Sequence, residues 1–217
     1  MLGTITSIES PVTRESAAWR AIGTCERAAA MLLLGATAPV VVGAAAVIAI
    51  LSRRSPLIAH RRVGHLGSTL WMFKLRTMWD EVPTRGGWIE FIEDERGPIA
   101  QSARDARVTS RFAAFCRRHS IDELPQLWHV VRGEMALIGP RPLTAGEIEA
   151  HYGDDAGELL SVKPGIAGLW QTSGRNRLTY AERRELDLAF VRGRSLRMYS
   201  RILARVFPEI WSGANTW

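Results

Sequence analysis

The stretch SIDELPQLWHVVRG, residues 120–133, predicts a helix with two acids in its first turn. Proline is tolerated in the first turn of a helix because its missing N–H would have no partner there, so Pro125 places the start near Asp122. Gly133 predicts the end of the helix, since glycine readily adopts the left-handed conformation found there. Asp122 and Glu123 therefore lie among free N–H groups at a helix N-terminus. Capping alone explains such acids in many helices, so their surroundings must decide.

Basic residues lie on both sides of this acid pair in the sequence. Arg117 precedes it, the turn GPRP carries Arg141, and the segment KPGIAGLWQTSGRN supplies Lys163 and Arg175. One carboxylate can attack phosphorus, and its neighbour can hold Mg²⁺, which prefers oxygen ligands. Arginines and the metal would neutralise the charge of a diphosphate and should keep Asp122 ionised. The pattern predicts chemistry on a phosphate ester or anhydride.

Composition and charge favour a globular chain with an anionic partner. The 217 residues allow one domain with a small appendage, and 47% are apolar. The net charge is +6, and all but two of the 28 basic residues are arginines, which favour forked contacts to phosphate and carboxylate. The partner is therefore a phosphorylated small molecule, an anionic lipid surface or a nucleic acid. With Cys25 and Cys116 alone, a disulfide framework and a four-cysteine zinc site are excluded.

Residues 28–51 form an apolar run without charge. As a helix they would span about 36 Å, enough to cross a hydrocarbon core of about 30 Å. Pro39 lies in the middle, where it removes a backbone hydrogen bond, and each half reaches only about 18 Å. Arginines flank both ends, and positive residues mark the cytoplasmic side, which fits a hairpin with both ends in the cytoplasm. From the residues alone, a simple span and a re-entrant helix are equally supported.

The patterning elsewhere predicts a mainly α fold with a small β component. We expect an N-terminal segment, the apolar membrane helix with Pro39 in its middle and a globular domain, at residues 1–27, 28–51 and 52–217. Within the last of these we expect a strand at residues 69–78 and a polar loop at residues 80–107. We also expect three helices, at residues 109–119, 180–193 and 194–211.

The last of these helices has an apolar stripe and an arginine-rich flank. Such a cationic amphipathic helix can lie in the membrane interface. It can equally pack on its own domain with the arginines in solvent, and the sequence leaves both open. Pro208 is expected to kink or end it.

Three segments resemble the bacterial sugar transferases, the monotopic phosphoglycosyl transferases. They are DELPQLWHVVRGEMALIGPRP, KLRTM and KPGIAGLWQTSGRN, and the resemblance covers about residue 28 to about residue 205. It implies an enzyme of the bacterial inner membrane, with a re-entrant helix broken at a proline and its catalytic domain on the cytoplasmic face. The implied reaction moves a sugar 1-phosphate from a nucleotide-diphosphate sugar, usually a UDP-sugar, to polyprenyl phosphate, which initiates polysaccharide or glycoconjugate synthesis.

The resemblance also implies residue roles. Asp122 would be the nucleophile that forms an aspartyl phosphosugar intermediate, and Glu123 would be the ligand of a Mg²⁺ cofactor. Substrate phosphates would be bound by basic residues, namely Arg117, Arg141, Lys163 and Arg175. The implied partners are the nucleotide-sugar donor, polyprenyl phosphate and membrane lipids, with no nucleic acid.

Two other hypotheses remain. The charge also suits a membrane-anchored polyanion-binding module, although that reading leaves the pair Asp122–Glu123 unexplained and no nucleic-acid motif accompanies it. An inactive scaffold of the same family is the other, and the intact acid pair argues against it. No residue identifies the sugar, the nucleotide or the polysaccharide pathway, and formation of a homo-oligomer stays open.

Overall fold

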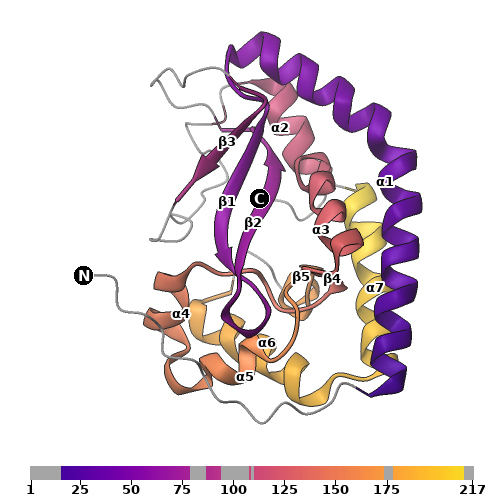
Figure 1. Cartoon of the computed structure of the whole chain (residues 1–217), viewed down its shortest axis with the longest axis vertical. Helices are drawn as coiled ribbons and strands as arrows, with labels where there is room; N and C mark the ends of the chain where they lie inside the picture. The colour runs from indigo at the N-terminus through magenta and orange to yellow at the C-terminus, as the bar shows by residue number, and fades with distance from the viewer. Residues whose placement is uncertain (1–15, 79–86, 94–107, 109, 174–177, 213–217) are drawn as a thin grey trace.

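The computed structural model describes residues 16–78, 87–93, 108, 110–173 and 178–212. Helices predominate and two small sheets complete the fold, which confirms the predicted mainly α class with a small β component (Figure 1). The α-helices are α1 Ala17–Ser52, α2 Arg111–Arg118, α3 Leu127–Arg132, α4 Ala145–His151, α5 Ala156–Leu160, α6 Tyr180–Gly193 and α7 Leu196–Ser212. The strands are β1 Leu57–Val63, β2 Thr69–Leu75, β3 Ile89–Ile92, β4 Ala136–Ile138 and β5 Gly165–Ala167. Short 3₁₀ helices are η1 His65–Gly67, η2 Ile121–Gln126, η3 Gly153–Asp155 and η4 Leu169–Thr172.

Helix α1 is a 36-residue helix that begins ahead of the charge-free run. The Ser16 side chain caps its N-terminus by accepting a hydrogen bond from the Trp19 N–H. The helix bends about midway along its length (Figure 1), and Pro39 inside it explains the bend through the missing N–H and the clash with the preceding turn. Only 17% of its most apolar window is buried, so α1 is long and apolar enough to cross a membrane and keeps most of that surface exposed.

The larger sheet has the strand order β2-β1-β3. Strands β1 and β2 are antiparallel neighbours joined through η1, and β3 pairs parallel to β1. An ion pair from Arg76, just after β2, to Glu90 on β3 ties the outer strands together. The polar loop predicted for residues 80–107 is therefore wrong where it is described, because Ile89–Ile92 pairs with β1 along the sheet edge.

Strands β4 and β5 form a parallel pair that continues into a close backbone contact. A Cβ on Gly165 would lie 2.0 Å from the backbone nitrogen of Gly139, so both positions need glycine for the chains to approach. This contact holds the GPRP turn beside the KPG segment.

Helix α1 packs along the domain through two apolar clusters. Its first half buries Ala30 against Leu70 and Val130, and its second half buries Ile48 against Leu75. The domain thus covers one stripe of α1 and leaves the rest of its apolar surface exposed.

Helix α7 runs beside the first half of α1 (Figure 1) and packs on its own domain. Ile202 and Val206 are buried against β4, β5 and Phe190. Part of the apolar stripe of α7 is therefore buried in the domain, while Leu196 and Leu203 of the same stripe stay exposed. Pro208 lies within α7, so the prediction that it could end the helix is wrong.

Candidate active site

The acid pair lies where the sequence predicted it, in a turn between α2 and α3. Ser120 adopts the left-handed conformation with φ 53°, which turns the chain out of α2, and Asp122 and Glu123 occupy the first turn of η2. The helix becomes α-helical only from Leu127, and Gly133 ends it with φ 75°. The predicted start and end are confirmed, and the first turn is tighter than predicted.

Lys74 lies directly beside the acid pair. Strand β2 carries it to Glu123, where Nζ lies 2.8 Å from Oε1 of the carboxylate. Both side chains are half-buried, so solvent screens this ion pair less than a surface pair. Glu123 therefore has a fixed cationic partner from a strand 49 residues away in the sequence.

Asp122 is almost completely buried, with 7% of its surface exposed. Burial raises the pKa of its carboxyl from 3.8 to about 6, and the negative charge of Glu123 adds to the rise, whereas Lys74 and Arg117 oppose it. The predicted effect of neighbouring cations is present, because Lys74 and Arg117 lower the pKa, but desolvation by burial is the larger contribution. A carboxyl of pKa about 6 is still mostly ionised at pH 7.

Arg117 lies on the last turn of α2 with its guanidinium near the acid pair. Its Nη1 donates a hydrogen bond to Thr77 Oγ1 at 3.4 Å, and Thr77 is buried just after β2. Its positive charge lowers the pKa of Asp122, the predicted nucleophile, and so favours the ionised carboxylate.

A pocket opens in front of Glu123, which we call the active-site pocket. It is lined by β2, η2, the GPRP turn, β5 and η4, through Met72, Lys74, Glu123, Gln126, Arg141, Pro142, Gly165, Ile166, Trp170 and Gln171. One carboxylate and two cations thus line a common space. Glu123 and Arg141 share this pocket, whereas Asp122 and Arg117 do not line it, and Arg117 is linked to Asp122 through its charge.

The Arg141 side chain is supported by aromatic and acidic groups. Its guanidinium lies 5.4 Å from the centre of the Trp170 ring, a cation–π geometry. Its backbone N–H donates to Asp187, a buried acid on α6 that also accepts a 2.9 Å hydrogen bond from the Tyr152 hydroxyl. Burial raises the pKa of Asp187 to about 7, while Tyr152 and Arg141 counter the rise.

The two remaining predicted site residues are Lys163 and Arg175. Lys163 is absent from the active-site pocket and lines a different one, formed by the start of α1, β4, α6 and α7. Arg175 lies outside the described residues. The structure therefore separates Lys163 from the acid pair and leaves its predicted contact with donor phosphates without geometric support.

A magnesium ion would find the carboxylate of Glu123 in this pocket. No cluster of three or more histidine, cysteine, aspartate or glutamate side chains with metal-binding geometry occurs among the described residues. Mg²⁺ often binds through one or two carboxylates and completes its shell with water and substrate phosphates. The carboxylate of Glu123, which lines the pocket, fits that pattern, with Lys74 already paired to one of its oxygens and Asp122 buried next to it in the chain.

Sequence reasoning missed Lys74 and Asp187 as parts of the site. Lys74 was visible as a cation in a strand that otherwise reads as apolar, two positions from Met72 and therefore on the same face. Nothing in the sequence around Asp187 distinguishes it from an exposed acid on a mixed-charge helix.

Comparison with known proteins identifies the relatives of this chain. A 39% identical stretch matches the UDP-galactose-lipid carrier transferase of Erwinia amylovora, covering 65% of this chain and 30% of that protein. The exopolysaccharide production protein ExoY of Sinorhizobium fredii is 38% identical over 70% of this chain and 68% of its own length. The undecaprenyl-phosphate galactose phosphotransferase of Salmonella typhimurium is 36% identical over 64% of this chain, which spans only 30% of that protein. A sequence model of the bacterial sugar transferases matches residues 19–213, and the chain belongs to this family.

Proposed function

We propose that this protein transfers a sugar 1-phosphate from a nucleotide-diphosphate sugar, a UDP-sugar, to polyprenyl phosphate. The observation that carries the proposal is Glu123 in a pocket that also holds Lys74 and Arg141, with the buried Asp122 next to it in the chain. Family membership supports the reaction class. The names of the Erwinia and Salmonella relatives, which refer to UDP-galactose, a lipid carrier and undecaprenyl phosphate, agree with it.

In the first step, a carboxylate oxygen of Asp122 attacks the β-phosphorus of the donor. A phosphorus–oxygen bond to Asp122 forms, and the bond between that phosphorus and the bridging oxygen breaks, so the nucleoside monophosphate leaves with the electron pair. The raised pKa of Asp122 matches this role, because a more basic carboxylate is a better nucleophile once ionised. Lys74 and Arg141 face the same space, where their charges offset those of the diphosphate.

In the second step, an oxygen of polyprenyl phosphate attacks the same phosphorus. The new bond forms the polyprenyl-diphosphate sugar, and the bond to Asp122 breaks, which restores the carboxylate. Arg117 opposes the rise in the pKa of Asp122 and therefore favours its departure as an anion.

Glu123 would hold Mg²⁺ in the pocket. When bound, the metal supplies positive charge that stabilises the phosphate oxygens and the leaving group. Lys74 orients Glu123 through the 2.8 Å ion pair and so keeps one carboxylate oxygen toward the pocket.

The proposed place of the reaction is the cytoplasmic face of the bacterial inner membrane. Helix α1 would enter the bilayer, bend at Pro39 and return, since it bends midway and its apolar surface is largely exposed. A cysteine at Ala38, in a background with Cys25 changed to serine, tests this arrangement in intact cells. A re-entrant helix predicts no labelling by an impermeant thiol reagent added outside, and ready labelling would favour a span.

The activity is tested by nucleotide release from a panel of sugar nucleotides. We expect the full chain to release the monophosphate in quantity only with both Mg²⁺ and polyprenyl phosphate. Without acceptor, intact-mass spectrometry should show the enzyme heavier by one sugar phosphate. Asp122→Asn should remove this adduct and lower turnover by about 10⁴-fold or more.

The exposed acid Asp154 offers a matched control, and Asp154→Asn should retain full activity. Equal turnover by Asp122→Asn and the unmodified chain would refute the nucleophile assignment. If that variant also bound polyanions normally and no sugar nucleotide were turned over, the polyanion-binding hypothesis would replace the transferase.

A further inference from the structure

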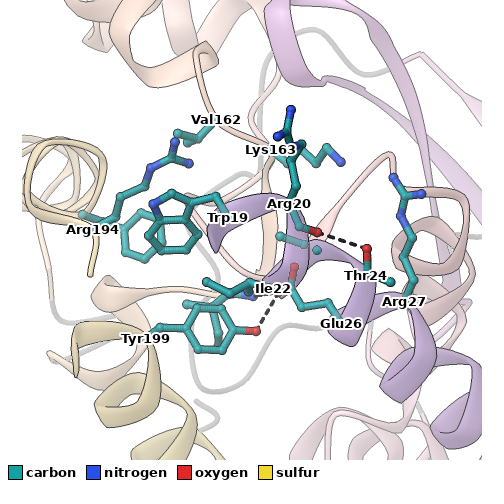
Figure 2. A pocket seen from close by; sticks show the side chains of 14 residues that line it. Trp19, Arg20, Ile22, Thr24, Glu26, Arg27, Val162, Lys163, Arg194 and Tyr199 are labelled. Carbon is teal, nitrogen blue, oxygen red and sulfur yellow. Dashed lines mark hydrogen bonds between the residues drawn. The ribbon is translucent and has the colours of Figure 1, made fainter. Parts of the chain in front are cut away.

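A second cavity, which we call the N-terminal pocket, lies between the first turns of α1, strand β4 and helices α6 and α7. Its volume is about 370 Å³, and it shares no lining residue with the active-site pocket. Figure 2 shows its side chains converging from α1 and from the C-terminal part of the chain. The transfer reaction proposed above uses none of them.

The charge of this pocket is strongly unbalanced. Four cations line it, Arg20, Arg27, Lys163 and Arg194, against the single acid Glu26. Among the described residues no ion pair involves Arg20, Arg27 or Lys163. The pocket therefore presents a surplus of positive charge to whatever enters it.

The single acid can offset only one of the four positive charges, and one oxygen of its carboxylate is engaged in the fold. Glu26 is buried, and its Oε1 accepts hydrogen bonds from the Leu137 N–H at 2.7 Å and from the Tyr199 hydroxyl at 2.7 Å. These contacts hold the start of α1 against β4 and α7. Glu26 thus serves the fold, and the four cations still leave the pocket with a net positive charge.

The cations approach the cavity from different sides. In Figure 2, Arg194 lies over the Trp19 ring on one side, and Arg20 and Arg27 project from α1 on the other, with Lys163 close to Arg20. The Arg194 guanidinium is 4.7 Å from the centre of that ring, which holds it in place without an anion. Such a convergent set of donors can surround a tetrahedral anion, as arginine and lysine do for phosphate.

The pocket also lies beside the proposed point of entry into the membrane. Trp19, Arg20 and Arg27 immediately precede the charge-free run that begins at residue 28. Tryptophan and basic residues are enriched at the level of lipid head groups, where anionic phosphates are concentrated.

We propose that the N-terminal pocket is a binding site for a phosphate group, separate from the active site, carried by an anionic lipid head group or by a free phosphate ion. Arg20, Lys163 and Arg194 contact the phosphate oxygens, and Glu26 keeps the wall of the site in place. This inference holds whether or not the chain transfers sugar phosphate.

Calorimetric titration of the full chain in uncharged detergent tests the site with three probes: inorganic phosphate, short-chain phosphatidylglycerol and zwitterionic short-chain phosphatidylcholine. We expect saturable binding of one of the two anionic probes and none of phosphatidylcholine. The double variant Arg20→Gln/Lys163→Met loses two charged contacts and should bind about 100-fold more weakly. The pair Arg201→Gln/Arg205→Gln removes the same charge from exposed positions outside the pocket and should bind normally.

The two anionic probes, phosphatidylglycerol and inorganic phosphate, distinguish the source of the phosphate group. Tighter binding of phosphatidylglycerol than of phosphate, dependent on the pocket, assigns a lipid head group, and the reverse order assigns a soluble phosphate. Because Lys163 is half-buried, the single exposed change Arg20→Glu provides a second variant with little risk to folding, and it should also weaken binding. Unchanged affinity in both pocket variants, an equal loss in the control pair, or no saturable binding of either anion would overturn the proposal.

Discussion

The two pockets both contain basic side chains, yet they treat charge in opposite ways. In the active-site pocket, Lys74 is paired with Glu123, and the buried Asp122 behind it is offset by Arg117. In the N-terminal pocket, Glu26 is bound by backbone and hydroxyl donors, and the cations around it are left without acidic partners among the described residues. In the active-site pocket the cations reduce the cost of burying ionised acids, whereas the surplus positive charge of the N-terminal pocket favours capture of an external anion.

The two pockets also differ in how their charged groups affect the stability of the fold. An ionised acid held in a buried site destabilises the fold, and its pKa rises accordingly. The cations at the N-terminal pocket are exposed (Arg20, Arg27) or half-buried (Lys163, Arg194), so water still solvates them and they cost the fold little. We therefore expect the buried acid of the active site to lower the free energy of unfolding.

The largest expected effect concerns stability at Asp122. Because its folded-state pKa is about 6 against 3.8, the folded chain binds the proton more tightly, so stability falls as pH rises from about 4 to about 6. The difference corresponds to about 3 kcal/mol above pH 6. Asp122→Asn should therefore raise the melting temperature at pH 7, with the gain vanishing below about pH 4.

Thermal unfolding across this pH range measures the effect, with Asp154→Asn as the control for loss of an exposed acid. A gain that is independent of pH, or a destabilised Asp122→Asn, would contradict the contrast between the two pockets.

Removal of the cation beside the acid pair should affect activity nearly as strongly. Lys74→Met leaves Glu123 without its partner and raises the pKa of Asp122 further, since Lys74 is one of the charges that lower it. Turnover should fall by about 100-fold, and the acid limb of the pH–rate profile, expected near pH 6, should move to higher pH. Lys74→Arg keeps the charge and should restore the limb. If the acid limb of Lys74→Met stayed at the same pH, Lys74 would have no electrostatic effect on the acid pair.

A smaller loss of stability is expected when the hydrogen bond between Tyr152 and Asp187, which supports Arg141, is removed. Tyr152→Phe removes the hydroxyl that donates to Asp187 at 2.9 Å. A hydrogen bond to a charged group contributes about 2 kcal/mol, and the pKa of Asp187, now about 7, should rise because Tyr152 lowers it. Chemical denaturation at pH 6 and pH 8 should show the larger loss at pH 8, where Asp187 must be ionised. Equal losses at both values would indicate a packing effect.

The smallest expected change sharpens the description of the N-terminal pocket. Gly133 has φ 75°, and a Cβ there would lie 2.3 Å from the Arg27 guanidinium, so Gly133→Ala strains the backbone and displaces Arg27. Gly153→Ala shares the backbone strain, at φ 48°, in open space, and should cost about 1 kcal/mol. Gly133→Ala should cost more and also weaken phosphate binding. Identical costs, with binding unchanged, would place Arg27 outside the site.

Much of the fold near the acid pair follows from local rules. The proline in the first turn, the acids at the N-terminus and the glycine at the end fixed the helix, and the structure places its end at Gly133. The long apolar helix and the class of fold are likewise consequences of composition and periodicity. Family motifs in the sequence pointed to the bacterial sugar transferases, which the comparison confirmed.

Long-range packing accounts for what local rules missed. Strand β3 needs β1 as a partner, and its short apolar sequence IEFI does not by itself indicate which strand it pairs with. Lys163 is adjacent in sequence to the glycine turn that lines the active-site pocket, yet its side chain faces the N-terminal pocket.

The sequence by itself determined that two neighbouring acids sit at a helix start in an arginine-rich chain with a long apolar helix. Only the tertiary structure decided which cations meet those acids, and that Asp122 is buried so deeply that its pKa rises. The reason is physical: the position of a charge along the chain follows from covalent order, but its solvation and its partners depend on how distant segments fold around it.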